Sequence, residues 1–162
     1  IVSAGAVSED GWLHTGDLGR FDASGRLEIV GRVSDTIISG GENVAPAEVE
    51  AGLLEHPAVA DAAVHPRVDP EWGEAVVATV VVRHGVSVDP DELRAHCAAR
   101  LAGFKIPKVF EFAEGLPRTP SGKLLRRSIQ ALAEWRDPGD LTTLDDPSAL
   151  EQIQAAVAQA GR

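Results

Sequence analysis

The sequence has few sulfur-containing and aromatic side chains: its 162 residues include no methionine, no tyrosine and one cysteine. A single cysteine cannot form an internal disulfide, so a disulfide-stabilised framework is excluded and a reducing compartment, the cytoplasm, is predicted. Cys97 falls within an apolar helical pattern over residues 90–101, which predicts a buried small residue. The chain also lacks an apolar run of about 18 residues, so we expect no membrane-spanning helix.

Basic side chains are in the minority, with 15 lysines and arginines against 25 acidic residues and a formal net charge of −10. A nucleic-acid or anionic-membrane binder would carry a basic surface, so we expect no nucleic-acid partner. A small anionic ligand is still compatible, because a local cluster of cations can oppose the net field. The N-terminus has neither an initial methionine nor a basic region before its apolar residues, which predicts a fragment of a longer protein and no signal peptide.

The hydrophobic pattern alternates between strand-like and helix-like segments. Strands are predicted at 18–21, 27–30, 59–64, 75–82 and 109–112, and helices from Pro46, over 90–101, over 124–135 and in the tail to Ala160. Pro46 and the acidic residues after it are typical of a helix start, with Glu48, Glu50 and Glu55 expected on the exposed face. This order predicts an α+β fold in which helices cover a small antiparallel sheet.

Two segments carry residues that suit a phosphate or ribose. Lys123 ends the run Pro-Arg-Thr-Pro-Ser-Gly-Lys just before a helical pattern. Its compact ammonium therefore stands on a flexible loop, from which it can approach a phosphate or a carboxylate. Asp17 follows Thr-Gly, where a carboxylate can accept both hydroxyls of a ribose, although Thr-Gly-Asp taken alone more often marks an aspartate that caps a turn.

Two further segments indicate a ligand-binding site only weakly when each is taken alone. Arg32 follows the predicted hairpin and suits ribose oxygens or a phosphate, but a solvated surface arginine is the ordinary alternative. Gly40 and Gly41 leave backbone N–H groups accessible to a ligand, although a Gly-Gly pair usually marks only a turn. No Gly-Lys-Ser/Thr follows them, so the segment is not a Walker loop.

Together these segments resemble the C-terminal part of an adenylate-forming enzyme, a superfamily that contains acyl-CoA synthetases, nonribosomal peptide adenylation domains and luciferases. The resemblance covers roughly residues 11–130. Its motifs are GWLHTGDLGRFDASGRLEIVGRVSDTIISGGENVAPAEVE, DPEWGEAVVATVV, FKIPK and LPRTPSGKLLRR, in that order. It implies the mobile C-terminal domain of AMP-forming ligases, preceded by a β-hairpin from the end of the N-terminal domain.

The resemblance also implies an activity. Such enzymes activate a carboxylic acid with Mg-ATP to an acyl adenylate and then pass the acyl group to a thiol, usually that of coenzyme A. Asp17 matches the aspartate that binds the ATP ribose, Arg32 matches an arginine near that ribose, and Lys123 matches the lysine that contacts the carboxylate and α-phosphate. Gly40 and Gly41 match the loop that lines the pantetheine path after the domain rotates.

More distant matches concern the coenzyme A nucleotide and the hinge. Trp72, Lys105 and Lys108 stand where related ligases meet the CoA nucleotide, although FKIPK is equally consistent with a solvated turn. Ser34 and Asp35 are the candidate hinge residues, because Ser34 occupies a position where the family commonly has Asp or Lys. No residue is predicted to bind a metal, and no cofactor is expected to be held firmly by this chain alone.

The implied organisation has three parts: residues 1–33 as the edge of the large N-terminal adenylation domain, 34–135 as the C-terminal AMP-binding enzyme domain, and 136–162 as a tail with a helix. Asn43 stands where acetyl-CoA synthetases have an arginine, whereas the tail GDLTTLDDPSALEQI resembles that same short-chain branch. The two signals conflict, so the length of the acid stays open. The implied partners are the N-terminal adenylation domain, a carboxylic acid, ATP and CoA.

Three other interpretations remain open. The chain could belong to a nonribosomal-type adenylation domain that loads a carrier protein. From a different class, it could be a standalone, non-catalytic module that binds a nucleotide or a partner domain. The Lys123 segment also resembles the site at which such synthetases are acetylated, so a lysine acetyltransferase is a candidate partner whose product would neutralise the lysine.

Overall fold

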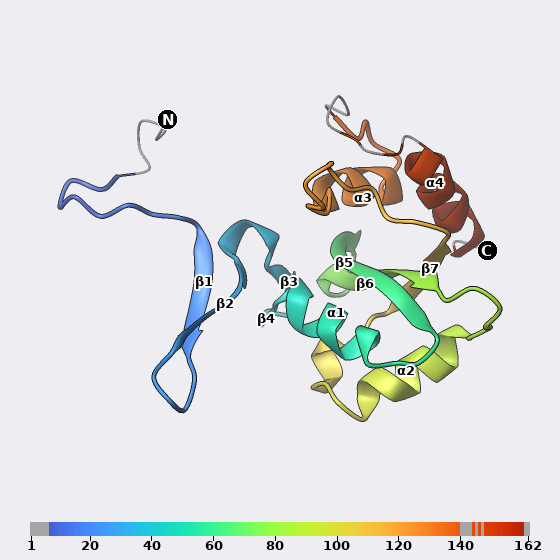
Figure 1. Ribbon diagram of the computed structural model, residues 1–162, viewed down its shortest axis with the longest axis horizontal. Helices are drawn as coiled ribbons and strands as arrows, with labels where there is room; N and C mark the ends of the chain where they lie inside the picture. The colour runs from blue at the N-terminus through green and yellow to red at the C-terminus, as the bar shows by residue number, and fades with distance from the viewer. Residues whose placement is uncertain (1–6, 140–143, 145, 147, 161–162) are drawn as a thin grey trace.

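The computed structural model describes residues 7–139, 144, 146 and 148–160. The chain begins with an antiparallel hairpin of β1 (Asp17–Phe21) and β2 (Leu27–Arg32), which stands to one side of the remaining elements (Figure 1). Asp22 closes the connecting loop, because its Oδ1 accepts hydrogen bonds from the backbone N–H groups of Ser24 (2.8 Å) and Arg26 (3.0 Å). The hairpin therefore owes its turn to local side-chain chemistry.

A five-stranded sheet forms the centre of the fold, in the order β4-β3-β6-β5 with β7 also paired to β6. Its strands are β3 (Ile37–Ser39), β4 (Glu42–Val44), β5 (Val59–Asp69), β6 (Gly73–Val82) and β7 (Val109–Ala113). The antiparallel pairing of β5 with β6 confirms the two predicted core strands, while β7 runs parallel to β6. The sheet is thus mixed, because a connection that contains a helix returns the chain to β7 in the same direction.

Helices cover both faces of this sheet (Figure 1). Their bounds are α1 (Pro46–Leu54), α2 (Pro90–Ala98), α3 (Arg126–Ala133) and α4 (Ser148–Ala160), with short 3-10 turns η1 (Val33–Asp35) and η2 (Gly103–Lys105). On β5, Val64 packs into the core with α1 and α2, and its neighbour Ala63 packs with α3 and α4, as the alternation of strand side chains requires. The predicted α+β class, a small sheet covered by helices, is confirmed.

The second helix has a defined start, and the prediction that it buries Cys97 is confirmed. The Asp89 side chain caps α2 by accepting a hydrogen bond from the backbone N–H of Glu92 at 2.8 Å, and Pro90 occupies the first turn. Cys97 is fully buried on the inner face of α2, and this burial raises the pKa of its thiol. Within the described ranges, no helix has both the length and the apolar character to cross a membrane.

A row of polar side chains is buried between the sheet and the helices α3 and α4. Glu111 of β7, Thr79 of β6 and His65 of β5 are all completely buried. The Thr79 hydroxyl donates to Glu111 Oε2 at 3.1 Å, and Arg67 Nη1 lies 3.7 Å from the other carboxylate oxygen. A buried carboxylate is costly unless it is paired, so this row stabilises one register of three neighbouring strands.

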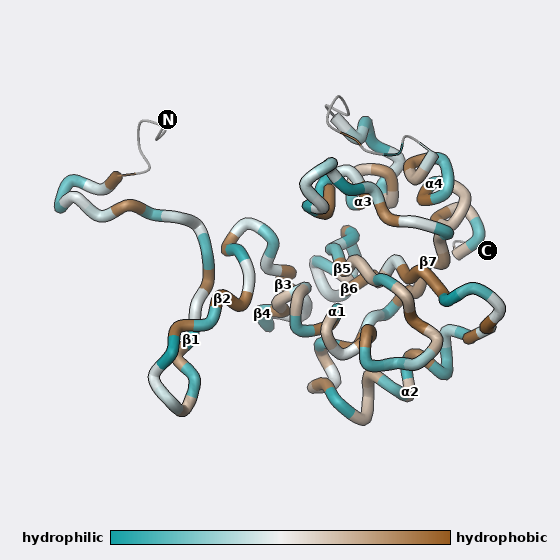
Figure 2. The backbone as a smooth tube through the Cα atoms, in the orientation of Figure 1, coloured by the Kyte–Doolittle hydropathy of each residue, from teal (hydrophilic) through white to brown (hydrophobic). Residues whose placement is uncertain are grey.

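The hairpin differs from this packed unit in its surface. Its side chains Phe21, Leu27 and Ile29 are more than half exposed, and Figure 2 shows apolar positions on the hairpin as well as in the packed part. The division of the chain at 33/34 and at 135/136 stays a prediction. Residues 1–6 of the first predicted part, and residues 140–143, 145, 147 and 161–162 of the predicted tail, lie outside the described residues.

Candidate functional site

The Lys123 loop is held in a defined shape by hydrogen bonds. Thr119 and Lys123 bond to each other twice: the Thr119 N–H donates to the Lys123 carbonyl at 2.9 Å, and the Lys123 N–H donates to Thr119 Oγ1 at 3.1 Å. Gly122 takes φ +82 in the turn between them, a conformation that glycine adopts without strain. Arg118 ties the loop to the sheet, donating to the Gly122 carbonyl at 2.9 Å and to Asp61 of β5 at 2.7 Å.

Asp17 and Arg32 lie side by side at the end of the hairpin. They are cross-strand partners of β1 and β2, and Arg32 Nε is 3.2 Å from Asp17 Oδ1. Both side chains stay partly open to solvent, so one oxygen of the carboxylate and most of the guanidinium remain available to a ligand. The register of the hairpin, which pairs Asp17 with Arg32, is what places these two residues together.

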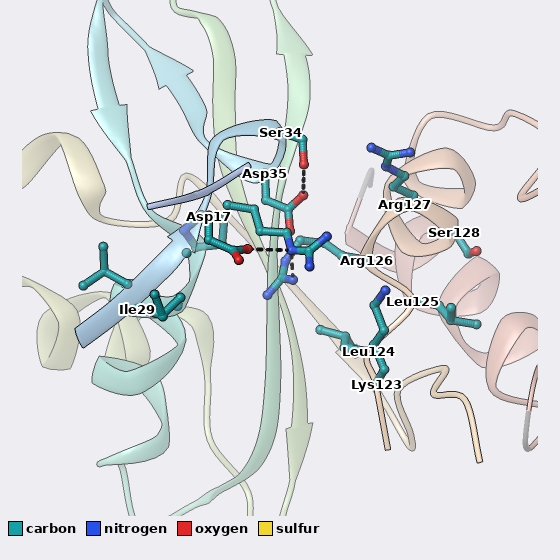
Figure 3. Close-up of a pocket in the computed structure, with 15 residues that line it drawn as sticks. Asp17, Ile29, Ser34, Asp35, Lys123, Leu124, Leu125, Arg126, Arg127 and Ser128 are labelled. Atoms are coloured by element: carbon teal, nitrogen blue, oxygen red, sulfur yellow. Dashed lines mark hydrogen bonds and ion pairs between the residues drawn. The ribbon is translucent and has the colours of Figure 1, made fainter. Parts of the chain in front are cut away.

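An open cleft of about 600 Å³ joins these two groups. One wall consists of Asp17, residues 29–32 and the η1 turn, and the other of residues 123–128 at the start of α3. Figure 3 shows Lys123 on one side of this cleft and Asp17 on the other. Among the residues that the structure describes, the ammonium of Lys123 has no ion-pair partner, so its charge is available to an anion in the cleft.

The candidate hinge residues form part of the same wall. Ser34 donates a hydrogen bond to Asp35 Oδ1 at 2.9 Å, and Asp35 Oδ2 lies 3.8 Å from Arg126 Nη1. Arg126 also pairs with Glu50 of α1 at 2.5 Å, so Glu50 is largely buried and the prediction that it lies exposed is wrong. Sequence reasoning missed Arg126 and Glu50 as site residues; the only signal for them was the pair of arginines that follows Lys123.

Gly40 and Gly41 form the two-residue turn between β3 and β4. Both have positive φ, +59 and +84, as a tight hairpin turn of this type requires. The Gly40 N–H donates to the Trp72 carbonyl at 2.9 Å, and a Cβ at Gly40 would stand 2.8 Å from the Trp72 ring. Lys108 lies over that ring, with Nζ 4.6 Å from its centroid. The structure therefore brings Gly40, Trp72 and Lys108 into one group.

Lys105 is not part of this group. Its ammonium donates to both carboxylate oxygens of Glu48 on α1, at 2.6 and 2.7 Å, and its side chain is 19% exposed. That pairing fastens η2 to α1 and leaves less of the charge for a ligand. Apart from Lys105, the predicted site residues thus fall into two groups, one around the cleft at Lys123 and one around the ring of Trp72.

The chemistry of the two groups is different. The cleft offers a free ammonium opposite a carboxylate and a guanidinium, which suits an anion that also carries hydroxyl groups. The Trp72 group offers a partly exposed ring, a cation and an open glycine turn, which suits a narrow chain ending in a stacked base and phosphates. No group of three or more histidine, cysteine, aspartate or glutamate side chains able to hold a metal ion occurs within the described ranges.

Comparison with known proteins shows which proteins this chain resembles. The family model described as AMP-binding enzyme C-terminal domain matches residues 48–123. The chain is 48% identical over 128 residues to a sulfoacetate–CoA ligase of Cupriavidus necator, covering 79% of this chain and 25% of that protein. It is 50% identical over 127 residues to a 2-succinylbenzoate–CoA ligase of Bacillus velezensis, covering 78% and 26%.

A solved structure agrees with these sequence matches. The o-succinylbenzoate CoA synthetase of Bacillus subtilis, in complex with an acyl-adenylate intermediate, superposes with a TM-score of 0.69 at 50% identity, over 75% of this chain and 25% of that one. The chain therefore spans about a quarter of the length of the curated relatives it matches. The matched domain, the shared fold and these identities make the chain similar to the AMP-binding C-terminal part of CoA ligases.

Proposed function

We propose that this chain is the C-terminal part of an acid–thiol ligase that activates a carboxylic acid with ATP and transfers the acyl group to coenzyme A. The observation that carries the proposal is the cleft in which the free ammonium of Lys123 lies opposite Asp17 and Arg32. Relatives at 48% and 50% identity that are CoA ligases support the same reaction class.

In the first half-reaction, a carboxylate oxygen of the acid attacks the α-phosphorus of ATP and pyrophosphate leaves. Asp17 accepts the ribose hydroxyls, and Arg32 holds Asp17 and the ribose oxygens. Lys123 stabilises the negative charge that builds on the α-phosphoryl oxygens and orients the carboxylate. No base is required, because a carboxylate nucleophile has no proton to lose. Mg²⁺ would accompany the ATP phosphates, and we assign no residue of this chain to it.

In the second half-reaction, the sulfur of coenzyme A attacks the acyl carbonyl, its proton passes to solvent, and AMP leaves. We propose that Gly40 and Gly41 border the pantetheine path. A Cβ at Gly41 would meet nothing within 4 Å, which leaves room for a narrow chain, whereas the Trp72 ring fills the space beside Gly40. Trp72 and Lys108 would stack on and neutralise the CoA nucleotide, and Lys105 would contribute only if it leaves Glu48. The two groups would then serve the two steps in turn, by rotation at Ser34 and Asp35.

The remaining parts of the site belong to a partner domain in this proposal. The exposed apolar side chains of the hairpin, such as Phe21 and Ile29, are the surface that an N-terminal adenylation domain would cover. We expect this chain alone not to catalyse adenylate formation. Acid-dependent exchange of pyrophosphate into ATP by the isolated 162-residue chain would contradict that expectation.

The function is tested on the full-length protein that contains this chain. Sulfoacetate, 2-succinylbenzoate and ferulate, the acids named for its relatives, are each supplied with ATP and CoA, and AMP and the CoA thioester are measured. A carrier protein offered in place of CoA tests the nonribosomal alternative. Formation of neither an adenylate nor a thioester with any acid in a broad panel would favour the non-catalytic module.

Lys123→Ala tests the role of the ammonium. Adenylate formation is expected to fall by about 100-fold or more, since one positioned electrostatic group is often worth that much. Thioester formation from supplied acyl adenylate should survive, and Lys123→Arg should retain part of the first step. Equal loss of both half-reactions in a folded Lys123→Ala protein would contradict the assigned role.

Three finer proposals accompany this function. We place the enzyme in the cytoplasm and, among acid substrates, include fatty acids. The exposed ammonium of Lys123 is also a candidate target of a lysine acetyltransferase, which would remove the charge that the first step needs. Mass spectrometry of the native protein tests for acetylation at Lys123. If Lys123 is never acetylated in cells, this proposal is wrong.

A further inference from the structure

The side chain of Arg126 contacts polar groups of three different elements beside the cleft. Its Nε donates to the Val64 carbonyl of β5 at 2.9 Å, and its Nη2 donates to Glu50 Oε1 of α1 at 2.5 Å. Glu50 Oε1 also accepts the Val64 N–H at 2.7 Å, which closes a small ring of hydrogen bonds. The remaining nitrogen, Nη1, lies 3.8 Å from Asp35 Oδ2 in the η1 turn. The guanidinium is therefore fixed on one side and reaches the turn with the other.

The contact between Arg126 and Asp35 joins two segments that carry predicted site residues. Arg126 opens α3, three residues after Lys123, so its placement and that of the Lys123 loop depend on the same segment. Asp35 ends η1, the short turn that connects the hairpin bearing Asp17 and Arg32 to β3. In Figure 3, Asp35 and Arg126 lie between Asp17 and Lys123. One guanidinium thus links the two walls of the cleft.

The contacts of Arg126 differ in strength. The bonds to Glu50 and Val64 are short, and the Glu50 side chain is only 14% exposed, so they are expected to persist. The contact with Asp35 is longer and the Asp35 side chain is 28% exposed, so water can replace it at a modest cost. Arg126 is therefore held firmly by Glu50 and Val64, and its contact with Asp35 at the turn can break.

We propose that Arg126 is a positioning residue for adenylation: through Asp35 it holds the η1 turn in the arrangement in which Lys123 faces Asp17 and Arg32. Breaking the Asp35 contact frees the turn to rotate toward the arrangement that serves the thiol step. The expected effect on adenylation rests on the proposed function. The effect of the Arg126–Asp35 contact on the η1 turn does not depend on that function.

Three variants separate the contact from general damage. Arg126→Ala removes all three interactions. Asp35→Asn removes only the charge at the turn and leaves the bonds of Arg126 to Glu50 and Val64, so it keeps the test valid if Arg126→Ala folds poorly. Arg100→Gln is the matched control, because Arg100 also pairs with a glutamate, Glu55 at the C-terminal end of α1, at 2.9 Å and on a surface away from the cleft.

The first measurement is amide hydrogen exchange in residues 33–36 of the full-length protein. There the Val33 N–H donates to the Gly16 carbonyl and the Thr36 N–H to the Val33 carbonyl. Arg126→Ala and Asp35→Asn are expected to speed this exchange by about tenfold, whereas Arg100→Gln and the β5–β6 amides stay at the wild-type rate. Wild-type exchange in Asp35→Asn would overturn the proposal.

The second measurement compares the two half-reactions, with the acid that the wild-type protein activates best. Arg126→Ala and Asp35→Asn should lower adenylate formation by about tenfold and leave thioester formation from supplied acyl adenylate within about twofold. Equal loss of both steps would mean a merely structural role and would overturn the proposal. If the wild-type protein forms no adenylate, the proposed function fails, and the exchange data still decide whether Arg126 holds the turn.

Discussion

Alanine at Gly40 is expected to destabilise the protein more than alanine at Gly41, although the two glycines are neighbours in one turn. Both residues have positive φ, which costs an alanine about 1–2 kcal/mol at either position. At Gly41 a new Cβ meets nothing within 4 Å, so backbone strain is the whole cost. At Gly40 the Cβ lies 2.8 and 3.1 Å from two atoms of the Trp72 ring, which must move.

The difference in stability cost between the two alanine substitutions depends on how easily the Trp72 ring can move. Trp72 is 38% exposed, so its ring can shift outward instead of being compressed in a core, and we take the low end of overpacking costs, about 1 kcal/mol. The totals are then about 1.5 kcal/mol for Gly41→Ala and about 2.5 kcal/mol for Gly40→Ala. At roughly 3 °C per kcal/mol for a chain of this size, Tm should fall by about 4 °C and about 8 °C.

Thermal unfolding of the 162-residue chain, followed by circular dichroism, measures both shifts. A Trp72→Ala background provides the decisive comparison, because without the ring Gly40→Ala should cost no more than Gly41→Ala. Under the proposed function, Gly40→Ala in the full-length protein should also raise the KM for CoA, since the displaced ring no longer lies under Lys108. Equal Tm shifts for the two alanines in the wild-type background would refute the reasoning.

Further predictions concern the rest of the fold. Asp89→Ala removes the cap of α2 and should lower the free energy of unfolding by about 1 kcal/mol, measured by urea denaturation, whereas Asp89→Ser should retain most of it. Because burial raises the pKa of Cys97, its thiol should stay unreactive toward a thiol reagent at pH 8 and react only when urea unfolds the chain. The Ser24 hydroxyl and the Arg26 N–H lower the pKa of Asp22 to about 2, so this carboxyl favours the folded hairpin above its ordinary pKa of 3.8 and loses that effect as the pH falls toward 2. Carbon NMR of Asp22 should show a midpoint near that lower value, and an ordinary midpoint would contradict the loop geometry.

Much of the fold could be predicted because the relevant physics is local. The alternating Val and Ala residues of β5 and β6 fit a sheet buried on both faces, Asp89 followed by Pro90 marks a helix start, and a Gly-Gly pair supplies the two positive φ values of a tight turn. Each pattern depends on residues within a few positions of one another. The chemical identities of Asp17, Arg32 and Lys123 were likewise visible as candidates.

Other features were decided by contacts between distant residues. Glu50 was expected to face water, yet it lies beneath Arg126, 76 positions later in the chain. Lys105 pairs with Glu48, 57 positions earlier in the chain, and its expected place near the CoA nucleotide stays a prediction. No rule of periodicity reports such pairings, because a helix face shows only that one side is polar and not which cation the fold will bring to it.

The sequence by itself determined the resemblance to AMP-forming ligases, the order of the main helices and strands, and the candidate residues for phosphate, ribose and a thiol carrier, since these depend on short motifs and local propensity. Only the tertiary structure decided that Lys123 faces Asp17 and Arg32, that Trp72 packs on Gly40 beneath Lys108, and that Arg126 connects the two walls of the cleft. Those relations arise when the β1–β2 hairpin, α1, β5 and α3 meet, and charge pairing across such elements is fixed by geometry that no single segment of the chain contains.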